Sequence, residues 1–271
     1  EFQPQLAGVE EIFNVIIEDL KAAVELLPST TEFKTRPTKS AANALMARVA
    51  LYLGDYERAY SSSNEALLDR SILLVYNEIN PNVSFPFTRF NEEVLCHSRM
   101  HNHSFIRNTE SLVISERLLA LYNENDLRRE LFFIERPGGI FNFRGSYDNS
   151  QTLFTGPTTA EMYLIAAEAK IRMGDLNEGT RLLNSLSDKR VEAGTFEELE
   201  FVSLDEALSY VLEERERELV FRGLKWMDIK RIGSNDGQSA TISRKIGEEV
   251  LTLNLSPGYI LPLPEREKSF Y

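Results

Sequence analysis

The side chains best suited to chemistry lie together in one short segment, residues 96–103. Cys96, His97, His101 and His103 are the only cysteine and histidines of the chain. Thiolate and imidazole groups bind zinc, but structural zinc sites use paired cysteines at short spacing, which are missing here. There is no Gly-x-Ser-x-Gly elbow for a nucleophile either. We predict no metal site here, with zinc binding as the alternative, and expect these residues to pack or hydrogen-bond in a loop.

The remaining polar residues form no catalytic motif. The 42 Asp and Glu residues could supply a glycosidase only if two carboxylates met across a cleft, and most fall on polar faces of predicted helices. Gly138-Gly139 is not followed by a lysine or a helix, as a phosphate-binding loop would be. We therefore predict that the chain is not an enzyme, has no catalytic residue and needs no cofactor.

Composition narrows the class of partner. The chain has 271 residues, 42% of them hydrophobic, and a formal net charge of −12. This charge argues against nucleic acid, whose phosphates require clustered Lys and Arg. No stretch approaches the roughly 18 apolar residues of a membrane span, and no signal peptide opens the sequence at Glu1. We expect that any targeting segment has been removed or was not included.

A helical unit occurs twice. Residues Ala47–Leu67 align without gaps on Ala167–Ser187, so that Gly54-Asp55 falls opposite Gly174-Asp175. In each copy a helix is expected to end at the glycine, and the aspartate to cap the next helix. Such hairpins resemble tetratricopeptide repeats, which bury their apolar faces by stacking. The alternative is coincidence, because Gly-Asp is a common turn between helices.

Further helices are marked by periodicity and caps. Apolar residues recur at three- and four-residue spacing from Val9 to the stop at Pro28, which predicts an amphipathic helix. Thr158 and Ser203 each precede a glutamate by three residues, as in a capping box. The second of these helices is expected to run to about Arg222.

The middle of the chain differs from both ends. It is rich in Asn, Pro, Gly and aromatic residues, with a short helix expected at 115–123 and a β-hairpin around Pro137-Gly138-Gly139. Long irregular insertions in helical scaffolds usually carry function. We predict a mainly α fold in a single domain, divided into helices with the first hairpin, a loop-rich insertion, the second hairpin with a further helix, and an extended tail: 9–69, 70–157, 158–232 and 233–271.

The densest unusual segment is ERERELVFRGLKWMDIKR, residues 214–231. A functional interpretation makes Trp226 a platform for a sugar ring. The structural interpretation, which we favour, places Glu214, Arg215 and Glu218 in a partly buried salt network and wedges Trp226 against the repeat helices.

This segment resembles the C-terminal signature of the SusD/RagB family, with Arg222 and Lys225 replacing the usual Glu and Arg. Other segments agree in order, including VIIEDLKAAVELLP, TKSAANALMARVALYLGDYERA, SERLLALYNENDLR, AEMYLIAAEAKIRMGDLNEG and ILPLPEREK. The residues that carry this resemblance and are expected to be structural are Gly54, Asp55, Gly174, Asp175, Glu214, Arg215, Glu218, Gly223, Trp226, Asp228 and Arg231.

The resemblance implies a function. Members of this family are surface lipoproteins of Bacteroidota that capture glycans or other nutrients without catalysis and cap a TonB-dependent outer-membrane transporter. The family is longer and begins with a lipidated cysteine, so the N-terminal part is expected to be missing here. Membrane contact would come only through that anchor. A helical-repeat adaptor for proteins and, less favoured, a glycoside hydrolase are the alternatives.

Ligand residues must be chosen on physical grounds, because the recognition loops of the family vary. Sugar rings require exposed aromatic faces with planar polar groups nearby. The insertion offers many aromatic residues, Phe90 among them, and we expect most of them to be core. As exposed ligand contacts we predict Tyr76, His101, Arg107 and Tyr147.

Overall fold

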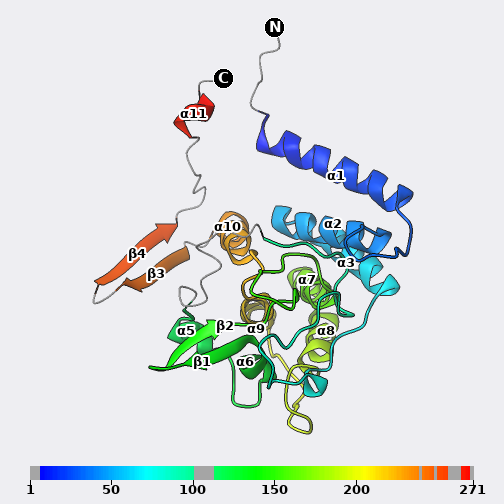
Figure 1. Ribbon diagram of the computed structural model, residues 1–271. Coiled ribbons are helices and arrows are strands. Elements are labelled where there is room, and N and C mark those ends of the chain that lie inside the picture. Colours follow the sequence, from blue (N-terminus) through cyan, green and yellow to red (C-terminus); the bar gives the residue numbers. More distant parts are fainter. Residues whose placement is uncertain (1–6, 101–112, 238–239, 247–248, 256–263, 269–271) are drawn as a thin grey trace.

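The computed structural model describes residues 7–100, 113–237, 240–246, 249–255 and 264–268. Helices lie side by side in its body, with loops and a small hairpin packed along one side (Figure 1). Both sheets of the described residues are two-stranded and antiparallel. The predicted mainly α fold is confirmed.

Two helical hairpins form the centre of this stack. They consist of α2 (Lys39–Leu53) with α3 (Tyr56–Asp69), and of α7 (Thr159–Arg172) with α8 (Leu176–Ser187). Gly54 and Gly174 take φ values of +77° and +89°, a left-handed conformation that costs glycine little. The predicted helix, Gly-Asp turn and second helix are thus present in both copies.

The aspartate after each glycine caps the next helix as expected. The carboxylate of Asp55 accepts from the amide of Arg58, and that of Asp175 from the amide of Glu178, both at 3.1 Å. The hairpins then stack through α3 and α7. Small residues allow this close approach, since Ala47, Ala59, Ala66, Ala167 and Ala169 are completely buried.

Helix α1 (Val9–Leu26) has Leu27 as its C-cap residue, and Pro28 follows. It packs on α2, where Ile17 and Leu20 meet Met46. Its apolar stripe is only partly covered, because Val9, Ile12 and Val15 remain exposed. The predicted amphipathic helix is confirmed.

Helix α9 (Leu204–Glu218) begins at its Ser203 cap, whose hydroxyl accepts from the amide of Glu206 at 3.2 Å. It ends four residues before Arg222, earlier than predicted. Phe221 and Gly223 take φ values of +58° and +80° in the following turn, which no helix can accommodate. Helix α10 (Lys225–Asn235) then begins.

The insertion holds a second core of mainly aromatic residues. Its elements are η1 (Tyr76–Glu78), α5 (Glu116–Leu119), α6 (Leu127–Phe132), β1 (Phe133–Arg136) and β2 (Ile140–Phe143). The predicted hairpin is confirmed, with its two glycines in left-handed conformation. The helix expected at 115–123 is shorter than predicted.

The tail contains β3 (Ala240–Ile246), β4 (Glu249–Leu255) and α11 (Glu265–Lys268). The sequence indicated extended chain here, but not that β3 and β4 would pair. Figure 1 shows this hairpin at the edge of the molecule, away from the repeat helices. The helices of the described residues are too short or too polar to span a membrane.

Candidate functional site

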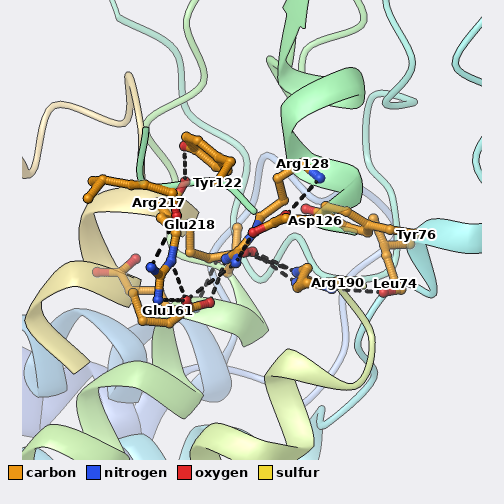
Figure 2. Close-up of polar contacts among 12 residues, drawn as sticks. Leu74, Tyr76, Tyr122, Asp126, Arg128, Glu161, Arg190, Arg217 and Glu218 are labelled. Carbon is orange, nitrogen blue, oxygen red and sulfur yellow. Dashed lines mark hydrogen bonds and ion pairs between the residues drawn. The ribbon is translucent and has the colours of Figure 1, made fainter. Parts of the chain in front are cut away.

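Buried ion pairs join the insertion to the helical stack. Arg190, which follows α8 and is completely buried, donates to Glu93 at 2.7 Å and to Glu218 at 2.9 Å. Its guanidinium also donates to the carbonyl of Leu74, as Figure 2 shows. A buried cation of this kind is tolerated only when it is paired and hydrogen-bonded. Arg190 therefore holds two parts of the insertion against α9.

Arg128 makes a second junction in the same network (Figure 2). It donates to Asp126 at 2.8 Å and to Glu218 at 3.0 Å, and it also pairs with Glu214. Burial alone raises the pKa of Glu214, but the guanidiniums of Arg128 and Arg217 outweigh it and lower the pKa to about 2. Glu214 is therefore ionised near neutral pH and holds the insertion to α9.

A third group of ion pairs ties α10 to α7 and α9. Glu168 on α7 accepts from Arg231 at 2.6 and 2.7 Å, and Arg215 lies 3.6 Å from the same carboxylate. Asp228 pairs with Arg215 at 3.1 Å and with Arg231 at 2.8 Å. Glu214, Arg215 and Glu218 are thus confirmed as members of a salt network, which is more deeply buried than predicted.

Trp226 lies on the same helix as Asp228 and Arg231. It occupies the first turn of α10 and is 38% exposed. Asp228 and Arg231 on the same helix form ion pairs with α9 and α7. The packing of Trp226 against the repeat helices stays a prediction.

Tyr76 and Tyr147 were predicted to be exposed contacts, and both are buried. Their hydroxyl oxygens lie 2.8 Å apart, and the Tyr147 hydroxyl donates to Glu93 at 2.8 Å. Phe87 packs against both rings. Because these contacts hide both rings from solvent, the exposure prediction is wrong for them. His101 and Arg107 lie outside the described residues.

The side chain of Phe90 stands out on the insertion surface. Its φ of +61° is strained for a bulky residue, and 42% of the residue is exposed. The ring meets His97 edge-on, with centroids 4.8 Å apart. Backbone strain that presents a hydrophobic ring to solvent points to a role in binding, since such strain collects at functional sites.

Planar polar groups surround a buried carboxylate behind this ring. Asp148 is completely buried, and its carboxylate lies 3.0 Å from Arg89 Nε and 3.7 Å from Arg99 Nη1. Ser150 donates to it at 2.7 Å. His97 Nε2 lies 3.1 Å away without the alignment of a hydrogen bond. Asp148 thus fixes the groups that accompany the exposed ring.

Two antiparallel segments position these residues. Arg99 pairs with Phe154, and the amide of Thr155 donates to the carbonyl of Ser98 at 3.0 Å. Gly156 allows the segments to meet, because a Cβ at this position would lie 2.0 Å from the carbonyl oxygen of Cys96. A tertiary contact between distant segments therefore sets the direction of His97 and Arg99.

The chemistry of this surface, which we call the Phe90 site (Arg89, Phe90, His97, Arg99 and Asp148), is that of recognition. Burial lowers the pKa of His97, and Asp148 offsets this effect only in part, so the imidazole is neutral near pH 7. Within the described residues no three His, Cys, Asp or Glu side chains gather to hold a metal ion. An aromatic face beside guanidinium groups suits a sugar ring and its polar substituents.

Sequence reasoning considered Phe90 and Arg89 but did not select them. The sequence shows Arg89-Phe90 and, separately, the turn-forming residues Asp148-Asn149-Ser150. Nothing in the sequence brings these two segments together. Only the tertiary structure does so.

A separate groove of about 420 Å³ lies between α1, α2 and α10. The stacked rings of Phe13 and Tyr52, 5.4 Å apart, line it together with Asn14 and Ser234. Its lining could also hold a polar ligand. We place the candidate site at Phe90, because the strained backbone is there.

Comparisons with known proteins give consistent results. A family model described as "SusD family" matches residues 154–265, and one described as "Starch-binding associating with outer membrane" matches residues 1–51. SusD-like protein P2 of Formosa agariphila is 25% identical, over 95% of this chain and 62% of that protein. The chain thus spans less than two thirds of this relative.

Solved structures share the fold. A SusD superfamily protein of Bacteroides fragilis has a TM-score of 0.75 at 20% identity, over 97% of this chain and 63% of that one. A protein of Bacteroides vulgatus described as a putative sugar binding protein has a TM-score of 0.73 at 22% identity, over 99% and 65%. At these identities the likeness concerns the fold.

Proposed function

Because this chain belongs to the SusD/RagB family, we propose that it is a non-catalytic receptor of the outer-membrane surface. It binds a glycan or another nutrient and passes it to a TonB-dependent transporter. The family model described as starch-binding and associating with the outer membrane supports this location and class of ligand. A relative of similar fold is described as a SusD-like carbohydrate binding protein.

The observation that carries the proposal is the exposed, strained ring of Phe90 beside Arg89 and Arg99. A ring held in this way stacks on a sugar without losing much side-chain freedom on binding. The insertion, residues 70–157, is the recognition part of this proposal, and His101 and Arg107 stay proposed contacts within it.

Glycan binding is tested first on an array, and the affinity of a hit is then measured by calorimetry. We expect Phe90→Ala to weaken binding about tenfold or more, as expected for loss of a central aromatic contact. Trp226→Ala is the matched control, since this ring is also partly exposed but lies on α10. Unchanged affinity of Phe90→Ala, or loss in Trp226→Ala alone, would refute the site.

The non-catalytic part has its own measurement. A hit glycan is incubated with the protein and analysed by chromatography. We expect the oligosaccharide to remain intact, because among the described residues Asp148 is the one carboxylate of the Phe90 site. Release of shorter products would support the hydrolase alternative instead.

A further inference from the structure

The charge around Phe90 differs from that of the whole chain. The formal net charge of the protein is −12. At the Phe90 site the side chains of Arg89 and Arg99 are 42% and 52% exposed and face a single buried carboxylate. A local positive surface on an acidic protein is not explained by composition.

Of the two arginines, Arg99 makes fewer side-chain contacts within the described part of the protein. Its Nη1 lies 3.7 Å from the Asp148 carboxylate, too far for a hydrogen bond, and its guanidinium has no hydrogen bond to a described residue. Arg89, in contrast, donates to both the carbonyl and the carboxylate of Asp148. Arg99 therefore keeps most of its donors available to a ligand.

A buried cation lies behind the same surface. Arg222 is only 7% exposed, and its guanidinium lies over the rings of Tyr147 and Phe154, at 4.0 and 4.6 Å from their centroids. The ring of Phe154 in turn contacts His97. Arg222 Nη1 is buried without a hydrogen-bond partner, and no carboxylate of the described residues pairs with this side chain. Arg222 therefore has no direct ion-pair partner among the described residues.

Lys34 completes the set of charges. Its ammonium donates to the carbonyl of Asn91 at 2.7 Å, and the amide of His97 donates to the Lys34 carbonyl. Glu92, at 4.0 Å, is its exposed partner. Lys34, Arg89, Arg99 and Arg222 are therefore four cationic side chains around this surface, and only Lys34, Arg89 and Arg99 have a carboxylate within 4.0 Å among the described residues.

We propose that the Phe90 site takes an anionic saccharide, one that carries a carboxylate or sulfate group. The sugar ring stacks on Phe90, and the acidic group binds Arg99 with help from Arg89. This inference rests on the proposed function and narrows its ligand class. Guanidinium groups suit it, because their planar donors match the oxygens of carboxylates and sulfates in pairs.

An anionic ligand also relieves the local charge imbalance, whereas a neutral sugar would leave it in place. Charges on exposed side chains are screened over about 8 Å at physiological salt, so an anionic group bound at this surface interacts mainly with the cations next to it. Binding should therefore depend on salt, with affinity falling as ionic strength rises.

The test uses the whole chain on an array of neutral, uronate-bearing and sulfated oligosaccharides. We expect acidic glycans to bind, and the affinity measured by calorimetry to fall several-fold between low and high salt. Arg99→Ala should weaken binding about tenfold or more, and Arg99→Lys by less. Arg181→Ala is the control, since Arg181 is similarly exposed but pairs with Glu178 on α8. We expect its affinity to stay within about twofold.

The outcomes separate this inference from the proposed function. Binding of neutral glycans alone would overturn the anionic ligand and leave the receptor proposal intact. Binding of acidic glycans that does not change in Arg99→Ala would overturn the placement of the acidic group. No binding to any class would overturn both proposals. The carboxylate and sulfate arms identify which acidic group is recognised.

Discussion

Aromatic residues of the insertion differ in solvent exposure, although all of them are large hydrophobic residues by type. Phe90 and Tyr147 belong to neighbouring loops, yet one ring faces solvent and the other is completely buried. Tyr147 has a hydroxyl that meets Glu93 and Tyr76, so it can be buried without losing hydrogen bonds. Phe90 is held outward by its backbone conformation.

Substitution of Tyr147 tests this distinction. We expect Tyr147→Phe to lower the free energy of unfolding by about 1–2 kcal/mol, because Glu93 and Tyr76 lose a buried partner. Affinity for a glycan hit should stay unchanged. Urea unfolding and calorimetry measure the two effects.

Tyr52→Phe is the control, because the Tyr52 hydroxyl has no hydrogen-bond partner among the described residues; its stability should match that of the parent chain. If Tyr147→Phe weakened glycan binding and left stability intact, Tyr147 would be a ligand contact after all.

The helix–Gly-Asp–helix element depends on local backbone conformation. Its aspartate lies three residues before the amide that it caps, so the sequence carries the whole interaction. Glycine is required here because of its backbone conformation, and a side chain at this position would find enough room. A Cβ at Gly174 would meet no atom within 4 Å, yet φ there is +89°.

Gly174→Ala is therefore expected to cost about 1 kcal/mol of unfolding free energy, entirely through strain of the left-handed backbone. Chemical denaturation measures this change. Gly174→Asn is the matched control, because asparagine tolerates the left-handed conformation better than alanine, and it should lose less. Equal stability of both variants would contradict the assigned turn.

At the scale of the whole molecule, buried ion pairs join insertion and helices. Glu168, Glu214, Glu218 and Asp228 each gain from facing guanidiniums more than burial costs, so the pKa of each carboxyl is lowered. The pKa of each of these carboxyls is lower in the folded than in the unfolded state. Its full contribution to the free energy of unfolding is therefore present at pH values above the unfolded-state pKa. It is lost as pH falls toward the folded pKa.

We therefore expect the free energy of unfolding to fall steeply as pH drops from about 5 toward 2. Glu214 alone accounts for roughly 3 kcal/mol of this change, since its pKa falls from 4.5 to about 2. Urea denaturation at stepped pH measures the slope.

Glu214→Gln should be less stable at pH 7 and show a shallower slope, whereas Glu18→Gln, at an exposed position, should follow the parent chain. A flat profile between pH 5 and 3 would contradict the role of these pairs.

Prediction from sequence succeeded where interactions are local. Helix caps, the glycine turns and the Pro137-Gly138-Gly139 hairpin involve residues a few positions apart, and the amphipathic spacing indicated the helices. The acidic and basic alternation of residues 214–218 indicated a salt network. Its partners Arg128 and Arg190 could not be foreseen, because they lie 86 and 28 positions from the glutamates they bind.

Sequence by itself thus determined the helical hairpins, their duplication and the resemblance to the family. The tertiary structure alone decided which polar and aromatic side chains are buried. Asp148 meets Arg89 across 59 positions, and Tyr147 meets Tyr76 across 71. Burial and ion pairing depend on such long-range contacts, and no local pattern encodes them. The candidate site therefore moved from Tyr76 and Tyr147 to the strained, exposed Phe90.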